Sequence, residues 1–321
     1  MSSEGLHKSA EVDRETVPHA LPPLWRLVLR RMSAIATLSK GGNSAPFYCV
    51  HPIGGDVTKF YDLARLLGPE QRFYGIQVPK EKMTDAFGAS IKAIARHYVE
   101  TLVAFQPEGT IVLGGWSVGA IIALEMAQQL RAIGRNVPLL VALDGAPCNT
   151  GGGINPWNPR YGWKLICNLP SWIKDDQRQN WSLSAFTRRV AAKLAFRTLV
   201  GMPTFIRQQT LHDEAVRDLM DNTGWLSGQR SFIRALYAAA RDYIPEPYAG
   251  RVIVYEARIQ PLWHLLQVGA AWTKIVRHIE IVIVDGSHTN LLEEPAVGVL
   301  AAHLRVQLAA LWAATEASGT L

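Results

Sequence analysis

Short apolar runs alternate with amphipathic helical patterns along most of the chain. The apolar runs predict strands at residues 47–50, 73–78, 111–115, 139–143, 251–255 and 279–284, and the amphipathic patterns predict helices at 57–67, 87–105, 120–133 and 295–314. Apolar strands that are separated by helices are typical of a parallel sheet covered on both faces. We therefore expect an α/β fold with a mostly parallel central sheet and helices on both faces.

The alternation stops at Pro147 and resumes near residue 245. The intervening stretch has no buried-strand pattern, is rich in Trp, contains a run of three glycines and shows a helical pattern at 183–199. We interpret residues 147–245 as a helical lid insertion over the sheet.

The amino-terminal part of the chain has a different character. Residues 1–42 are expected to form a flexible tail, in which the basic and apolar stretch at 21–39 predicts an amphipathic helix. That helix would either pack on the domain or dock a partner. A Gly-rich linker at 41–44 precedes the single α/β domain, which we expect to span residues 43–321.

The composition is that of an ordinary globular protein, with 48% hydrophobic and 19% charged residues among 321. Residues 1–20 carry acidic side chains and lack an apolar run, so they do not resemble a secretory signal. We expect no stretch long enough to span a membrane. The cysteines, Cys49, Cys148 and Cys167, are odd in number and lack metal-like spacing. These features predict free thiols, no metal site and a cytoplasmic location.

The net charge of +6 is concentrated in the predicted insertion. Residues 148–210 hold nine Lys or Arg residues and two Asp residues, an excess of +7. Such a segment could attract an acidic partner or a phosphate, and the alternative is a solvated lid surface. No recognised nucleic-acid-binding motif accompanies it, so we expect no nucleic-acid partner.

The predicted strand at 111–115 runs directly into a Gly-x-Ser-x-Gly turn and a helix. Gly115 and Gly119 remove side chains that would collide in a sharp strand-to-helix reversal, and Ser117 stands at its apex. A serine so placed is exposed at the top of the sheet. We therefore predict that Ser117 is a nucleophile.

A serine hydroxyl needs a base, and that base needs an orienting acid. His288 is the predicted base, because it directly follows a strongly apolar strand pattern. Asp144 is the predicted acid, because it ends an apolar strand where an ionised carboxylate must be paired. Asp285 is the rival acid, although it more plausibly shapes the turn before His288. The later loop at 257–263 contains no carboxylate.

Two backbone amides are needed to stabilise an oxyanion beside the serine. We predict that Val118 provides one and that Ile53, in the loop after the first strand of the domain, provides the other. His51 is expected to hold that loop in place by hydrogen bonding.

These motifs resemble those of the thioesterases of polyketide, non-ribosomal peptide and fatty acid synthases. The resemblance rests on His51-Pro52-x-Gly54-Gly55, Gly114-Gly115-Trp116-Ser117-x-Gly119, Leu143-Asp144 and Gly286-Ser287-His288, in the family's order, and extends from about residue 46 to residue 311. The early acid is similar to that of the chain-releasing members. The resemblance implies an α/β-hydrolase fold with a helical lid.

The resemblance also implies a substrate and a partner. The substrate would be an acyl thioester on the phosphopantetheine arm of an acyl or peptidyl carrier protein, with no further cofactor. Because this chain contains no carrier domain, the carrier would act in trans. Release would occur by hydrolysis or by cyclisation.

Two other functions fit the same residues. A carboxylester hydrolase or lipase would use the same Ser117, His288 and Asp144, because the triad does not distinguish oxygen esters from thioesters. A non-catalytic module that binds an acyl carrier would keep the pocket without needing the triad.

Overall fold

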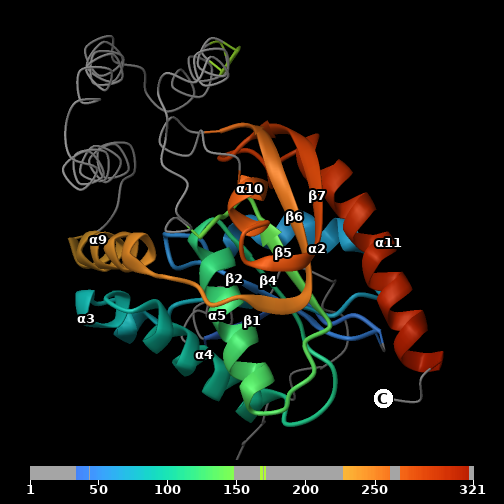
Figure 1. Ribbon diagram of the computed structural model, residues 1–321, viewed down its shortest axis with the longest axis horizontal. Coiled ribbons are helices and arrows are strands. Elements are labelled where there is room, and N and C mark those ends of the chain that lie inside the picture. Colours follow the sequence, from blue (N-terminus) through green and yellow to red (C-terminus); the bar gives the residue numbers. More distant parts are fainter. Residues whose placement is uncertain are drawn as a thin grey trace, which may run out of the picture.

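The computed structural model of the protein describes residues 34–42, 44–147, 167–168, 170, 227–260 and 268–317. Its centre is a seven-stranded sheet in the order β1-β3-β2-β4-β5-β6-β7 (Figure 1). The strands are β1 (Ile35–Ser39), β2 (Phe47–Val50), β3 (Phe73–Ile76), β4 (Val112–Trp116), β5 (Leu139–Leu143), β6 (Tyr248–Ile259) and β7 (Val276–Ser287). Strand β1 runs antiparallel to β3, and all the other neighbouring pairs are parallel.

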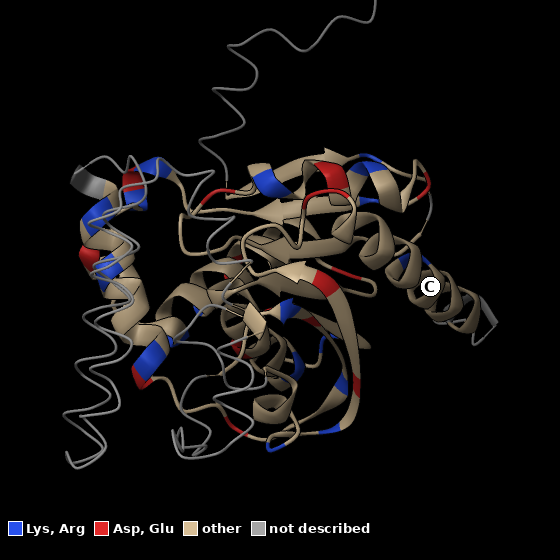
Figure 2. Ribbon diagram, turned by 90° about the horizontal axis from the view of Figure 1, so that it is seen from above, with Lys and Arg blue, Asp and Glu red and all other residues tan. Residues whose placement is uncertain are grey.

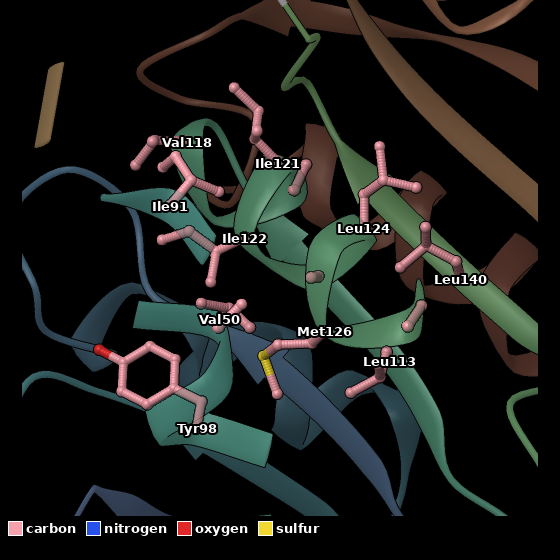
Figure 3. Close-up of a cluster of buried hydrophobic side chains, with 14 of the residues drawn as sticks. Val50, Ile91, Tyr98, Leu113, Val118, Ile121, Ile122, Leu124, Met126 and Leu140 are labelled. Atoms are coloured by element: carbon pink, nitrogen blue, oxygen red, sulfur yellow. The ribbon is translucent and has the colours of Figure 1, made fainter. Parts of the chain in front are cut away.

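Helices cover both faces of the sheet. They are η1 (Thr58–Phe60), α2 (Tyr61–Leu67), η2 (Lys80–Lys82), α3 (Asp85–Gly88), α4 (Ile91–Phe105), α5 (Val118–Ala132), α9 (Ser227–Asp242), α10 (Val268–Trp272) and α11 (Ala296–Ala317). One apolar cluster joins the sheet to α4, α5, α9 and α10, and a second joins the opposite face to α2 and α11. Figure 3 shows the first cluster, in which Ile122 of α5 lies near Val50 of β2 and Leu124 of α5 lies near Leu140 of β5. The expected α/β arrangement is therefore present.

Strand β1 corrects the expectation for the amino-terminal segment. Residues 35–39, predicted as the end of an amphipathic helix, form the antiparallel edge strand, and Ile35 pairs with Ile76 of β3. The sheet thus begins before the predicted boundary at residue 43. The tail and the rest of the predicted helix, residues 1–33, lie outside the described residues.

Other elements differ from the predictions at their ends. The expected helix at 87–105 is two helices, because the Ser90 side chain accepts a hydrogen bond from the Ala93 amide and caps a new helix, α4. Strands β6 and β7 are both longer than predicted, and β7 begins at Val276.

Most of the predicted lid, residues 148–166, 169 and 171–226, lies outside the described residues. The last part of the predicted insertion forms α9. Phe232, Ile233 and Leu236 of this helix are fully buried in the first apolar cluster. Helix α9 is thus an integral part of the domain body.

Helix α11 bears on the expectation about membranes. Within the described residues, one segment, Ala296–Ala314, is long and apolar enough to cross a membrane, which corrects the expectation that no stretch reaches that length. Its buried Leu300, Leu304 and Leu308 pack in the second apolar cluster. Packing against the sheet therefore accounts for the buried face of α11, while Val299 and Val306 remain exposed.

Charged residues of both signs are interspersed over the described chain (Figure 2). The basic excess predicted for residues 148–210 falls almost wholly outside the described residues.

Candidate active site

Ser117 occupies the sharp turn between β4 and α5. Its φ of 57° and ψ of −123° place it in a backbone region that side-chain-bearing residues rarely adopt. The Ser117 amide donates to the Leu143 carbonyl at 2.9 Å, and the Ser117 carbonyl accepts from the Ala120 amide at 3.1 Å. The turn is thus fixed both to the end of β5 and to the first turn of α5.

The glycines that flank Ser117 are required by close backbone approach. A Cβ on Gly115 would lie 2.1 Å from the Gly119 carbonyl oxygen, and a Cβ on Gly119 would lie 2.4 Å from the carbonyl oxygens of His51 and Val50. The start of α5 therefore packs directly against the loop that follows β2. This contact brings the two backbone segments of the predicted oxyanion site together.

Asp144 follows β5 with its carboxylate fully buried. Its backbone has a φ of 46°, and its amide donates to the Tyr255 carbonyl of β6 at 2.8 Å. Carboxylate Oδ1 accepts hydrogen bonds from the Ala257 amide at 2.8 Å and from the Gln260 side chain at 2.6 Å. Carboxylate Oδ2 lies 2.7 Å from Nδ1 of His288. Burial of this charge is therefore balanced by three donors.

His288 reaches Asp144 from the loop after β7. Its amide donates to the Ile259 carbonyl at 3.3 Å, and its side chain is 19% exposed. The turn that contains His288 is stabilised by Asn290, whose Oδ1 accepts from the Ser287 amide at 2.6 Å. Because Nδ1 faces a carboxylate, it carries the proton, and Nε2 remains available as a base.

The structure brings these three predicted residues to the same edge of the sheet. The Asp144–His288 contact is direct. Ser117 is hydrogen-bonded to the residue before Asp144, and the ring of its neighbour Trp116 lies 5.8 Å from the His288 ring, between centroids. The rival acid, Asp285, is exposed and forms an ion pair with Arg258. Asp144 is therefore the carboxylate that contacts the histidine.

The loop after β2 is held by His51, as the sequence predicts. His51 is fully buried, with Nδ1 2.6 Å from the Pro52 carbonyl and Nε2 2.8 Å from the Tyr98 hydroxyl of α4. Burial lowers the pKa of His51 from 6.5 to about 4, so the ring is neutral near pH 7. Ile53 lies in this loop and packs against the first apolar cluster. Both predicted oxyanion donors, Ile53 and Val118, thus belong to segments that meet at Gly119.

Two parts of the site escaped the sequence analysis. Gln260 and the Ala257 amide, which both bind Asp144, lie at the end of β6 in a loop that had been searched only for carboxylates. Trp272 of α10 donates to the Gly145 carbonyl at 2.7 Å and so supports the loop that begins at Asp144. A buried carboxylate must have donors, but the sequence carries no signal that shows which amides, more than 100 residues from Asp144, would supply them.

In the part of the chain that the structure describes, no group of three or more His, Cys, Asp or Glu residues could hold a metal ion. Cys49 and Cys167 are free thiols, and burial raises the pKa of the Cys49 thiol well above its usual value.

Residues 45–154 match the family model described as Thioesterase domain. The resemblance to thioesterases is confirmed. The thioesterase-like sequence is 24% identical, over 86% of this chain, to the Dimodular nonribosomal peptide synthase of Bacillus subtilis (strain 168). Over 34% of the chain it is 34% identical to Enterobactin synthase component F of Escherichia coli (strain K12). The chain spans only 11% and 8% of the lengths of these two proteins.

A solved structure gives the same fold. The NocB thioesterase domain from the Nocardicin cluster is 22% identical, covers 86% of this chain and 99% of its own, and superposes with a TM-score of 0.56. The same domain is known in a covalent complex with a fluorophosphonate nocardicin G analog. The expected α/β-hydrolase fold is thereby confirmed for this thioesterase-like chain.

Proposed function

We propose that this chain is a serine thioesterase that releases an acyl chain, a polyketide or a peptide, from the phosphopantetheine thioester of a carrier protein. The observation that carries the proposal is the direct Asp144–His288 contact beside the Ser117 turn. The thioesterase-domain match over residues 45–154 supports the thioester as the bond attacked. Release to water gives a free acid, and release to a nucleophile within the chain gives a ring.

The reaction would proceed in two acyl transfers. His288 Nε2 takes the proton of the Ser117 hydroxyl while Oγ attacks the thioester carbonyl carbon. The amides of Val118 and Ile53 stabilise the oxyanion of the tetrahedral intermediate, at the positive end of α5. Collapse breaks the carbon–sulfur bond, and the departing sulfur takes the proton from His288. Water or an internal nucleophile then repeats the sequence on the acyl-serine, with His288 again as the base.

Asp144 would support both steps electrostatically. It holds the proton of His288 on Nδ1 and stabilises the imidazolium that forms each time Nε2 accepts a proton. No protein-bound cofactor or metal enters these steps. The carrier would act in trans, in the cytoplasm, and the relatives named above as synthases support a carrier-bound substrate.

Matched small substrates test the proposal. An acyl N-acetylcysteamine thioester and the oxygen ester of the same acyl chain should both be turned over, with the higher kcat/KM for the thioester, and Ser117→Ala should abolish both reactions. A higher kcat/KM for the oxygen ester would favour a carboxylester hydrolase. No turnover of either substrate would favour a carrier-binding module without catalysis.

A further inference from the structure

A buried amide, the side chain of Gln260, lies against the carboxylate that contacts His288. Gln260 is 1% exposed. Its Nε2 donates both to Asp144 Oδ1 at 2.6 Å and to the Ala257 carbonyl at 2.8 Å. Because both partners are acceptors, only the amide nitrogen can face them, and the orientation of the amide is fixed.

The two oxygens of Asp144 have separate partners. Oδ1 is held by the Ala257 amide and by Gln260, from two directions, whereas Oδ2 faces His288. A carboxylate held at Oδ1 by two donors cannot rotate about its Cβ–Cγ bond without breaking both hydrogen bonds. Oδ2 therefore stays directed at the imidazole.

We propose that Gln260 is a positioning residue for the acid of the proposed triad. Its amide fixes the rotation of the Asp144 carboxylate and, through it, the ring of His288. This inference rests on the proposed function for its kinetic consequence, while the hydrogen-bonding role stands on geometry alone.

The position needs a neutral donor, which explains why this loop contains an amide and no carboxylate. An ionised carboxyl group at residue 260 would put a second negative charge against buried Oδ1, and it could donate to Oδ1 only after binding a proton. The other charged groups nearby are engaged elsewhere: Glu256 accepts from the Gly269 amide, and Asp285 pairs with Arg258. Gln260 supplies a donor at Oδ1 without adding charge.

Two substitutions test the role. Gln260→Met keeps the length of the side chain and removes the donor, and Gln260→Glu keeps its shape but replaces the amide nitrogen with oxygen. We expect kcat for an acyl N-acetylcysteamine thioester to fall about 10-fold in the first variant and further in the second, with KM unchanged, because a hydrogen bond to a charged group is lost. The low-field proton resonance of His288 Nδ1–H should broaden or disappear in both variants.

Gln71 provides the matched control. It is also a buried glutamine, and its Nε2 donates to the carbonyls of Ala45 and Arg72. Gln71 lies just before β3, at the amino-terminal ends of the parallel strands, whereas Gln260 lies after β6, at their carboxyl ends. Gln71→Met should lower the melting temperature while kcat and the His288 resonance remain at wild-type values. If Gln260→Met does not fold, kcat and the His288 resonance of Gln260→Glu test the positioning role.

The outcomes separate this inference from the proposed function. Wild-type kcat and an unchanged His288 resonance in the Gln260 variants would overturn the positioning role. Equal losses of kcat in the Gln260 and Gln71 variants would also overturn it, because they would indicate general destabilisation. If wild-type protein turns over no thioester, the proposed function fails, and the resonance alone then decides whether Gln260 orders the Asp144–His288 pair.

Discussion

Replacement of Asp144 with asparagine should inactivate the site through the orientation of the new amide. Oδ1 of Asp144 accepts hydrogen bonds from the Ala257 amide and the Gln260 side chain. In Asp144→Asn, the carbonyl oxygen must take this position, because an NH₂ group there would face two donors. The NH₂ group is then directed at Nδ1 of His288, 2.7 Å away in the wild-type protein. Nδ1 must lose its proton to accept this bond, and Nε2 becomes protonated and cannot act as a base.

The size of the effect follows from the lost charge. A unit negative charge about 4 Å from an imidazolium, at an effective dielectric constant of about 20, contributes roughly 4 kcal/mol. Loss of that contribution to the transition state corresponds to a decrease in kcat of about 10³-fold. The variant should remain folded, since the asparagine fills the same volume.

The assay is thioester hydrolysis with purified wild-type and variant protein, accompanied by circular dichroism to confirm the fold. Asp285→Asn is the control, because Asp285 lies three residues before His288 but is exposed and paired with Arg258. We expect its kcat to stay within about twofold of wild type, as for most surface substitutions. Near-wild-type turnover by Asp144→Asn, or a large loss in Asp285→Asn alone, would refute the assignment of Asp144.

Three further predictions concern stability. Burial lowers the pKa of His51 to about 4, so the unfolded state binds more protons below pH 6.5 and stability falls as the pH drops from about 6.5 to about 4. His51→Gln cannot titrate, so over this pH range its free energy of unfolding, measured with urea, should fall by up to about 3 kcal/mol less than that of the wild-type protein. Equal decreases in the two proteins would contradict a neutral, buried His51 ring. Tyr243→Phe should lower the free energy of unfolding by about 1.5–3 kcal/mol, because buried Glu125 loses a 2.6 Å hydrogen bond. An unchanged free energy of unfolding, measured in the same way, would contradict a stabilising role for this hydrogen bond. Gly119→Ala should lower the free energy of unfolding by at least about 3 kcal/mol, because the new Cβ would collide with backbone oxygens. In the control Gly298→Ala, the new Cβ meets only the end of the flexible Glu294 side chain, and the decrease should be less than about 0.5 kcal/mol. Similar melting temperatures for the two variants would contradict this reasoning.

The sequence patterns were most reliable where burial was complete. Strands β2 and β5 lie at the predicted residues, because every residue in them is buried and each forms a continuous apolar run. The length of strand β7 was underestimated, since it is an edge strand whose first residues include polar Arg277, His278 and Glu280 and form no continuous apolar run. Strand β1 was missed because its five residues include polar Thr37 and Ser39 and are mostly half-buried, so they carry little apolar signal.

In the candidate site, too, the sequence predicted some residues and missed others. Ser117, Asp144 and His288 were predicted from their position after apolar strands, because the carboxyl ends of parallel strands meet at one edge, and the structure places Asp144 against His288. Their catalytic roles remain predictions. Gln260 could not be recognised, because a neutral amide in a loop has no distinctive pattern, and only the coordinates show which oxygen it contacts. The oxyanion roles of Ile53 and Val118 remain predictions.

The central claim is that Ser117 is the nucleophile, and covalent labelling tests it most directly. Wild-type protein and Ser117→Ala would be treated with a fluorophosphonate probe, digested, and examined by peptide mass spectrometry. We expect the probe on the peptide that contains Ser117 in the wild-type protein and no labelling in Ser117→Ala. Labelling of a different residue, or an unlabelled wild-type protein that is folded and of native mass, would contradict the claim.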